Sequence, residues 1–390
     1  MTPQTKDLKI ALVHDFLIDF GGAERVLRTL SEMFPEAPIY TLLAEKENFP
    51  TWLQGKKIET SFLQKWPKFL RKRKKWLLPL LPVAPETFDL REFDLVISSS
   101  GAWSKGIVTR LNTVHISYLH SPMRFVWDAS SSYLREQKKN SLINFFAGCV
   151  KNYLRVWDRA ASDRPDYLIV NSNYTKERVR KYYGRGAQII YPPVSLREQA
   201  HLRNVAGGSA PKQLPKDYFL IVSRLAPYKK VDVAIEAFNK LELPLVIVGT
   251  GTEERYLKSI AGKNIQFLGF QSDEKLATIY AGATGFIFPA VDDFGIAPVE
   301  AMLAGVPVLA IRKGGAKEIV KEGVTGEFFD AATPEVLSDG VRRFKENRAN
   351  YNREKIIARA REFSEERFKK EMTEFIENIY VNHRTSKNNC

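Results

Sequence analysis

Two cations that could bind a phosphate group follow the first strand expected in the second half of the chain. Arg224 and Lys229 lie five residues apart in the turn after Tyr218–Val222, and a helical pattern follows them. Parallel sheets bind ligands at the carboxyl ends of their strands. An arginine and a lysine placed there could hold a diphosphate and stabilise it as a leaving group without a metal ion. A solvated basic turn is the alternative.

A later loop carries two carboxylates eight residues apart. Asp292 lies in the loop after a strand at Gly285–Phe288, and Glu300 lies just inside the following helix, whose first turn contains Pro298. Carboxylates accept hydrogen bonds from neighbouring sugar hydroxyls, and the unpaired N–H groups of a helix start bind phosphate or sugar oxygens. The loop could therefore bind a sugar nucleotide; a helix start with ordinary favourable acids is the alternative. The residues expected to present backbone N–H groups are Phe294, Gly295 and Ile296.

A pair of glycines follows the first strand of the chain, which we expect to end at Val13–Asp15. Gly21 and Gly22 open a helix with one apolar face. Glycines let backbone N–H groups approach an anion, and the electropositive helix start suits a diphosphate. The spacing matches neither the dinucleotide fingerprint nor the P-loop, so a tight turn without a ligand is an open alternative.

Two series of short β-branched strands, separated by helical patterns, would position these loops. The first series is Lys9–Val13, Ile39–Leu43, Asp94–Ser98, Val114–Leu119 and Tyr167–Asn171. The second is Tyr218–Val222, Pro244–Val248, Ile265–Leu268, Gly285–Phe288 and Pro307–Ile311. Alternating strands and helices predict an α/β protein with two doubly wound, Rossmann-like parallel sheets facing each other across a cleft.

The pair Pro192–Pro193 interrupts the pattern between the two series, and a polar stretch follows it. We therefore expect an N-terminal domain over residues 1–192 and a C-terminal domain over 193–364. Residues 365–390 contain an amphipathic pattern at Glu365–Tyr380, which predicts a final helix that packs back on the N-terminal domain.

Composition limits the function classes. Lysine and arginine exceed acidic residues by 14, which favours anionic partners, and 44% hydrophobic with 27% charged residues is typical of a folded soluble protein. The two cysteines, Cys149 and Cys390, predict neither a disulfide framework nor a cysteine metal site. The first residues lack the pattern of a secretory signal, so we expect a cytoplasmic protein.

The segment 62–82 contains seven cations and no acid. Its large apolar residues alternate in blocks with the cations, as in segments that lie on anionic membranes. We expect it to bind the inner face of the cell membrane; a nucleic-acid patch and a solvated loop are the alternatives. The apolar side chains expected at the headgroup boundary are Trp66, Phe69, Leu70, Trp76 and Leu77.

Four segments together resemble glycosyltransferase family 4, whose members are retaining enzymes of GT-B fold. The spacing of Asp292 and Glu300 resembles the family's E-x7-E motif, although the first acid is usually glutamate. This departure puts the sugar contacts of the shorter Asp292 in doubt; Asp293 could compensate, point to solvent or cap the loop. The other matching segments are Gly21–Val26, Tyr118–Arg124 and Ser223–Arg224 with Lys229, in the family's order over nearly the whole chain.

The resemblance implies a role for each matching residue. Arg224 and Lys229 would hold the donor diphosphate, while Glu300 would bind the ribose and Asp292 the sugar hydroxyls. The N-terminal domain would bind the acceptor, and its Gly22 would contact the phosphate and sugar of the donor. The implied catalytic residues are His120, Arg224, Lys229 and Asp292. The implied donor-binding residues are Gly21, Gly22, Arg224, Lys229, Asp292, Phe294, Gly295, Ile296 and Glu300. No Asp-x-Asp occurs, so we expect no metal, and no cofactor besides the nucleotide-sugar co-substrate.

The implied activity is retaining transfer of a hexose to a lipid-linked or oligosaccharide acceptor in cell-surface polysaccharide synthesis. Segments 120–124 and 293–296 resemble bacterial mannosyltransferases of polysaccharide and O-antigen assembly, which favours GDP-mannose as the donor. A UDP-sugar donor and a non-catalytic nucleotide-sugar-binding scaffold at the membrane are open alternatives. The acid loop argues against a GT-B epimerase or phosphorylase, and we expect no nucleic-acid partner.

Overall fold

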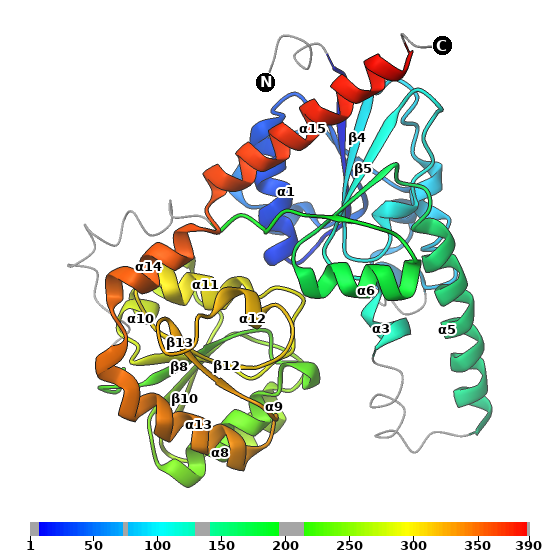
Figure 1. Cartoon of the computed structure of the whole chain (residues 1–390). Helices are drawn as coiled ribbons and strands as arrows, with labels where there is room; N and C mark the ends of the chain where they lie inside the picture. The colour runs from blue at the N-terminus through cyan, green and yellow to red at the C-terminus, as the bar shows by residue number, and fades with distance from the viewer. Residues whose placement is uncertain (1–7, 73–76, 129–140, 195–213, 388–390) are drawn as a thin grey trace. The chain divides into compact units, whose positions relative to one another are not determined.

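The computed structural model describes residues 8–72, 77–128, 141–194 and 214–387 (Figure 1). The chain forms two compact units. The first comprises Met1–Tyr191 and Phe368–Cys390, and the second comprises Pro192–Arg367. The chain thus passes into the second unit at Pro192 and returns to the first with its final helix.

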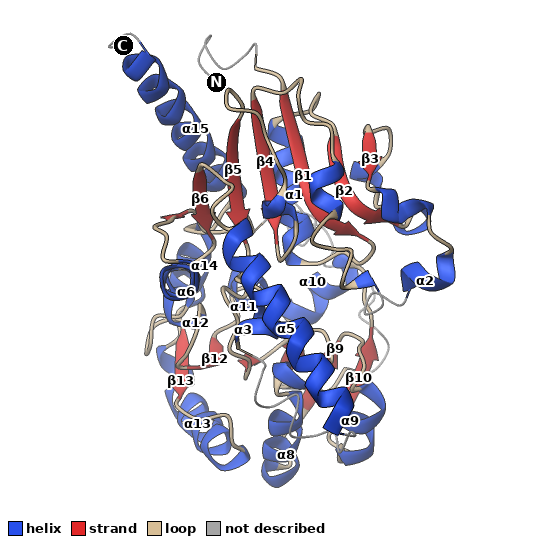
Figure 2. Ribbon diagram, turned by 90° about the vertical axis from the view of Figure 1, so that its right-hand side faces the viewer, coloured by secondary structure: helices blue, strands red, loops and turns tan. Residues whose placement is uncertain are grey.

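The first unit is built on a seven-stranded parallel sheet in the order β3-β2-β1-β4-β5-β6-β7, whose central strands lie side by side in Figure 2. The order reverses between β1 and β4, which is where open α/β sheets bind ligands. The strands are β1 (Ile10–Leu17), β2 (Ile39–Ala44), β3 (Ile58–Thr60), β4 (Leu95–Ser100), β5 (Val114–Leu119), β6 (Tyr167–Val170) and β7 (Gln188–Ile189).

Helices cover the first unit's sheet, and α1 and α15 share one core cluster with β1 and β4. The apolar residues of α15 recur every three or four positions, so Phe368, Met372 and Ile376 are all buried on one face. Each such side chain contributes about 1.5–3 kcal/mol by leaving water, which holds the C-terminal helix on the first unit. The helices are α1 (Gly22–Met33), α2 (Lys68–Lys72), α3 (Arg124–Trp127), α5 (Ser141–Ala161), α6 (Asn173–Tyr183) and α15 (Glu365–Lys387).

The second unit has a six-stranded parallel sheet in the order β10-β9-β8-β11-β12-β13, which reverses between β8 and β11. Its strands are β8 (Phe219–Val222), β9 (Leu245–Val248), β10 (Ile265–Gly269), β11 (Gly285–Phe288), β12 (Val308–Ile311) and β13 (Gly326–Phe329). Its helices are α8 (Val231–Leu241), α9 (Glu254–Ile260), α10 (Asp273–Ala281), α11 (Ile296–Leu303), α12 (Ala316–Ile319), α13 (Pro334–Glu346) and α14 (Arg353–Arg361).

The α/β class and the two parallel, doubly wound sheets confirm the predicted fold class. Three short edge strands, β3, β7 and β13, were not predicted. The first strand was wrongly expected to end at Val13–Asp15. It continues to Leu17 because Phe16 and Leu17 still pair with β2, so His14 and Asp15 lie within the strand. Among the described helices, none is both long and apolar enough to cross a bilayer.

The basic segment 62–82 is partly built into the first unit. Leu77 is 1% exposed and belongs to a core cluster with Leu63 and Leu81, so its predicted place at a membrane surface is wrong. Phe69 is 66% exposed and Trp66 36%, while Leu70 is half-buried and Trp76 lies outside the described residues. Two cations of the segment form ion pairs with acids outside it, Lys68 with Glu47 and Arg71 with Glu45.

Candidate functional site

The basic turn of the second unit lies at the carboxyl end of β8. The chain leaves the strand at Val222, passes an exposed Arg224 and enters a short 3-10 helix that ends at Lys229. The Nζ atom of Lys229 lies 2.5 Å from Oδ2 of Asp292, and both side chains are largely buried. The structure therefore brings together a cation and an acid that are 63 residues apart in sequence.

The acid loop follows β11, the strand next to β8, and α11 begins at Ile296. Glu300 is buried in this helix and accepts a hydrogen bond from the Tyr280 hydroxyl at 2.8 Å. Tyr280 lies on α10 and was not predicted as a site residue, because its link to Glu300 depends on how two helices pack. The bond fixes one carboxylate oxygen, Oε2, and so orients the other.

The backbone of the acid loop is packed tightly. Gly295 has φ +108°, which favours glycine, and the Phe294 ring is buried against Phe363. Phe294 can thus meet a ligand through its backbone rather than its ring. Asp293 is buried, so of the orientations considered for it, exposure to solvent is wrong. Ile296 is half-buried at the first position of α11.

Two further glycines support this loop from the turn after β12. Gly315 donates its N–H to the carbonyl of Asp292 at 3.0 Å. A Cβ at Gly315 would lie 2.4 Å from Cα of Phe294, and one at Gly314 would lie 2.4 Å from the Asp292 carbonyl oxygen. Because real Cβ atoms do not approach so closely, both positions require glycine. They set the position of the acid loop, and sequence reasoning missed them.

In the first unit, Gly21 is the N-cap of α1 and Gly22 its first residue. The carboxylate of Glu24 accepts a hydrogen bond from the Gly21 N–H at 2.7 Å. The glycine pair was predicted to offer backbone N–H groups to an anion. The N–H of Gly21 already donates to an acid of the same helix.

His120 follows β5 and is held at three points. Its backbone N–H donates to the Ser100 carbonyl at 2.8 Å, its carbonyl accepts from Asn171 at 2.9 Å, and its ring Nε2 lies 2.8 Å from the Ser99 hydroxyl. Burial, reinforced by the nearby charge of His14, lowers the pKa of His120 to about 4. The His120 ring is therefore neutral at pH 7.

His14 lies directly beside Ser99 in the register of β1 and β4. Its Nε2 is 3.2 Å from Oε1 of Glu24. Burial by itself lowers the pKa of His14, because it disfavours the protonated ring. The hydrogen bond and charge of Glu24, together with the charge of Asp15, have a larger combined effect, so the pKa of His14 is raised. Burial likewise opposes ionisation of Glu24, yet the hydrogen bond and charge of His14 lower its pKa below the ordinary value.

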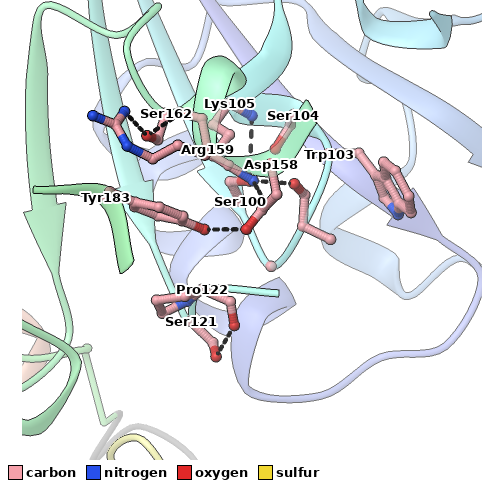
Figure 3. A network of polar contacts seen from close by, with 12 residues as sticks. Ser100, Trp103, Ser104, Lys105, Ser121, Pro122, Asp158, Arg159, Ser162 and Tyr183 are labelled. Carbon is pink, nitrogen blue, oxygen red and sulfur yellow. Dashed lines mark hydrogen bonds and ion pairs between the residues drawn. The ribbon is translucent and has the colours of Figure 1, made fainter. Parts of the chain in front are cut away.

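Buried charges fix the loop after β4. The Asp15 carboxylate accepts four backbone N–H bonds, 2.7–3.1 Å long, from Gly101 to Ser104. Nζ of Lys105 lies 2.5 Å from Oδ1 of Asp158 on α5, and both side chains are fully buried (Figure 3). The Tyr183 hydroxyl donates to the other oxygen of Asp158. These contacts make a rigid support beside Ser99.

Comparison with known proteins identifies both halves of the chain. The model described as Glycosyltransferase Family 4 matches residues 20–198, and the model described as Glycosyl transferases group 1 matches residues 208–363. Together they match most of the chain, and each falls largely within one of the two compact units.

Curated relatives are similar over part of the chain. A GDP-mannose-dependent alpha-(1-6)-phosphatidylinositol monomannoside mannosyltransferase of Mycobacterium tuberculosis is 29% identical over 47% of this chain and 53% of its own length. A GDP-mannose-dependent alpha-mannosyltransferase of Corynebacterium glutamicum is 37% identical over 28% of this chain and 26% of its own length. The chain thus spans between a quarter and about half of the length of these relatives.

Solved structures are similar over nearly the whole fold. HepE of Anabaena in complex with UDP has a TM-score of 0.66 at 20% identity, over 95% of this chain and 100% of that one. Sucrose-phosphate synthase of Thermosynechococcus elongatus has a TM-score of 0.72 at 17% identity, with the same coverage of both chains. These likenesses, with the two parallel sheets, show the GT-B fold. The two family models, which together match most of the chain, show that it belongs to glycosyltransferase family 4.

Proposed function

We propose that this chain transfers mannose from GDP-mannose to a lipid-linked or oligosaccharide acceptor, with retention of the anomeric configuration and without a metal ion. The observation that carries the proposal is the cluster at the β8/β11 edge of the second unit. There Lys229 pairs with Asp292, while Glu300 is oriented by Tyr280. Mannose as the donor sugar is supported by the names of the mycobacterial and corynebacterial relatives.

In this proposal the donor diphosphate binds Arg224 and Lys229, the ribose hydroxyls bind Glu300, and the sugar hydroxyls bind Asp292. The bond between the anomeric carbon and the phosphate oxygen breaks, and the acceptor oxygen forms a bond to that carbon on the same face. The acceptor proton passes to the departing phosphate oxygen. The two cations stabilise the charge that develops on the leaving group, which is a large contribution in such sites.

A donor screen tests the binding half of the proposal. GDP-mannose, GDP-glucose, UDP-glucose and UDP-galactose are added to the full chain, and the melting temperature is measured, because a ligand of the folded state raises it by mass action. We expect the largest rise with GDP-mannose. A larger rise with a UDP-sugar would reassign the donor. Binding without release of free nucleotide in the presence of acceptor lipids would favour the non-catalytic scaffold.

The cation assignment is tested by Lys229→Met, with Lys240→Met as the matched control on the same unit. Lys240 is exposed and pairs with Glu335 on the surface. We expect Lys229→Met to reduce donor turnover by at least 100-fold, the size seen when one stabilising group of a developing oxyanion is removed, and the control to stay near wild type. Full turnover in Lys229→Met would refute the assignment. Proton NMR of the product anomer tests retention, and turnover after chelation of divalent ions tests metal independence.

A membrane location at the inner face of the cell membrane is part of the proposal. It is supported by the exposed aromatic rings of Trp66 and Phe69 within a basic segment. The test is sedimentation with anionic liposomes. We expect the double variant Trp66→Ser/Phe69→Ser to bind less than wild type, and Leu111→Ser, which changes a fully exposed residue elsewhere on the unit, to bind as wild type. Equal binding of all three would refute this role for the rings.

A further inference from the structure

A chain of hydrogen bonds in the first unit links the start of α1 to the ring of His120. Glu24 accepts from the Gly21 N–H through Oε2, and its Oε1 lies 3.2 Å from Nε2 of His14. Nδ1 of His14 lies 3.1 Å from the carbonyl oxygen and 3.2 Å from the hydroxyl of Ser99. That hydroxyl lies 2.8 Å from Nε2 of His120.

The partners of His14 fix where its protons are. The Ser99 carbonyl can only accept, so Nδ1 of His14 carries a proton. The Glu24 carboxylate also accepts, so Nε2 carries one as well. His14 is therefore an imidazolium held between two acceptors, in keeping with the raised pKa of His14 and the lowered pKa of Glu24.

The Ser99 hydroxyl can then donate its hydrogen bond to only one of its two histidine contacts. It cannot donate to His14, whose Nδ1 is protonated, and within the described residues its remaining contact is Nε2 of His120. The hydroxyl proton therefore points to His120, so Nε2 is the acceptor and the single proton of the neutral His120 ring is on Nδ1.

We propose that Glu24, His14 and Ser99 are positioning residues that hold His120 in its Nδ1–H tautomer, so that the Nδ1 side of the ring donates a hydrogen bond and cannot accept one. The effect of this tautomer on turnover rests on the proposed function. It excludes His120 as a general base, because the nitrogen with the free lone pair faces Ser99.

Imidazole ¹⁵N NMR of the full chain tests the tautomer without any substrate. The chain has five histidines, and His14→Gln and His120→Gln variants assign the two signals. At pH 7 we expect His120 with Nδ1 protonated and Nε2 bare, and His14 protonated on both nitrogens. A His120 ring protonated on Nε2, or a neutral His14, would overturn the proposal. Because no sugar is needed, this outcome is independent of the proposed function.

Ser99→Ala and Ser98→Ala form a matched pair for activity. Both serines are fully buried on β4, and each contacts a histidine Nε2, since Ser98 lies 2.9 Å from His115. With GDP-mannose as the probe, we expect kcat to fall about tenfold in Ser99→Ala, the size of one lost hydrogen bond, and to change less than about twofold in Ser98→Ala. Equal losses in both variants would indicate a structural role only and overturn the proposal.

The variant Glu24→Gln tests whether the negative charge of Glu24, rather than the shape of its side chain, keeps His14 protonated. Glutamine still accepts from the Gly21 N–H and still reaches His14, but it removes the negative charge that stabilises the imidazolium. We expect the His14 signals to become those of a neutral ring at pH 7, while Glu36→Gln, at an exposed position just after α1, leaves them unchanged. A His14 that stays protonated in Glu24→Gln would contradict the proposed chain of contacts. Absence of turnover in the wild type would count against the proposed function alone.

Discussion

Replacing Lys105 by methionine should strongly destabilise the first unit. The ammonium group lies 2.5 Å from Asp158, donates to the Ala102 carbonyl, and is fully buried together with its partner. Removing one member of a buried ion pair leaves the other charge uncompensated, which costs about 3–5 kcal/mol. Methionine fills most of the lysine stem, so little of the loss comes from a cavity.

The lower end of that range applies here. Asp158 keeps two donors in the variant, the Tyr183 hydroxyl and the Trp127 Nε1–H, each at 2.7 Å. We therefore expect a loss of about 3 kcal/mol in the free energy of unfolding. The control is Lys68→Met, whose ion pair with Glu47 leaves the lysine 47% and the glutamate 77% exposed. Its loss should stay below about 1 kcal/mol.

Urea denaturation followed by tryptophan fluorescence measures both variants on the correct unit, because all six tryptophans of the chain lie in the first unit. With a slope of about 2–3 kcal/mol per molar urea, Lys105→Met should lower the midpoint by about 1 M. A shift no larger than that of Lys68→Met would refute the reasoning. The double variant Lys105→Met/Asp158→Asn should lose less than the sum of the single variants, because it removes the orphaned charge.

Three further predictions concern acid stability and the second unit. Burial, with the charges of Arg185 and Arg164, lowers the pKa of His115 to about 3. Since the unfolded chain binds this proton near pH 6.5, stability present above that pH is lost as the pH falls, and His115→Gln should lose less between pH 7 and pH 4.5 in the same urea assay. Tyr280→Phe should raise KM for the nucleotide sugar roughly tenfold by freeing Glu300, with little change in kcat; steady-state kinetics that show an unchanged KM would exclude this role. Gly315→Ala should weaken donor binding by tenfold or more in calorimetric titration, because its Cβ would lie 2.4 Å from Phe294, whereas Gly340→Ala, with only side-chain atoms at 3.3 Å or beyond, should bind normally.

The sequence predicts the loops that carry charge but not which charges meet. Arg224, Lys229, Asp292 and Glu300 could be placed at carboxyl ends of strands from the order of patterns along the chain. The contact between Lys229 and Asp292 additionally requires β8 and β11 to be neighbours, which is a property of sheet order. Tyr280 and Gly315 could not be found in this way, because each acts through tertiary packing that leaves no mark in local spacing.

The contacts around His120 also depend on tertiary structure that the sequence does not reveal. A sequence pattern shows that β1 and β4 are strands, but the pairing of His14 with Ser99 depends on the register between them. Because the first strand was expected to end at Val13–Asp15, the sequence did not show that His14 pairs within the sheet or that its ring contacts Glu24. The predicted surface position of Leu77 was wrong for a related reason. An apolar residue in a basic segment can lie at the surface or in the core, and the sequence pattern does not show that Leu77 packs with Leu63 and Leu81.

Both units place their polar side chains at the point where the strand order reverses. In the first unit His14 and Ser99 lie on β1 and β4, and in the second unit the basic turn and the acid loop follow β8 and β11. The crossover connections run in opposite directions from such a pair of strands and leave the carboxyl edge between them open. We therefore expect substitutions at these positions to alter binding and turnover, whereas the buried pair of Lys105 and Asp158 supports Ser99 from outside this edge and should act on stability first.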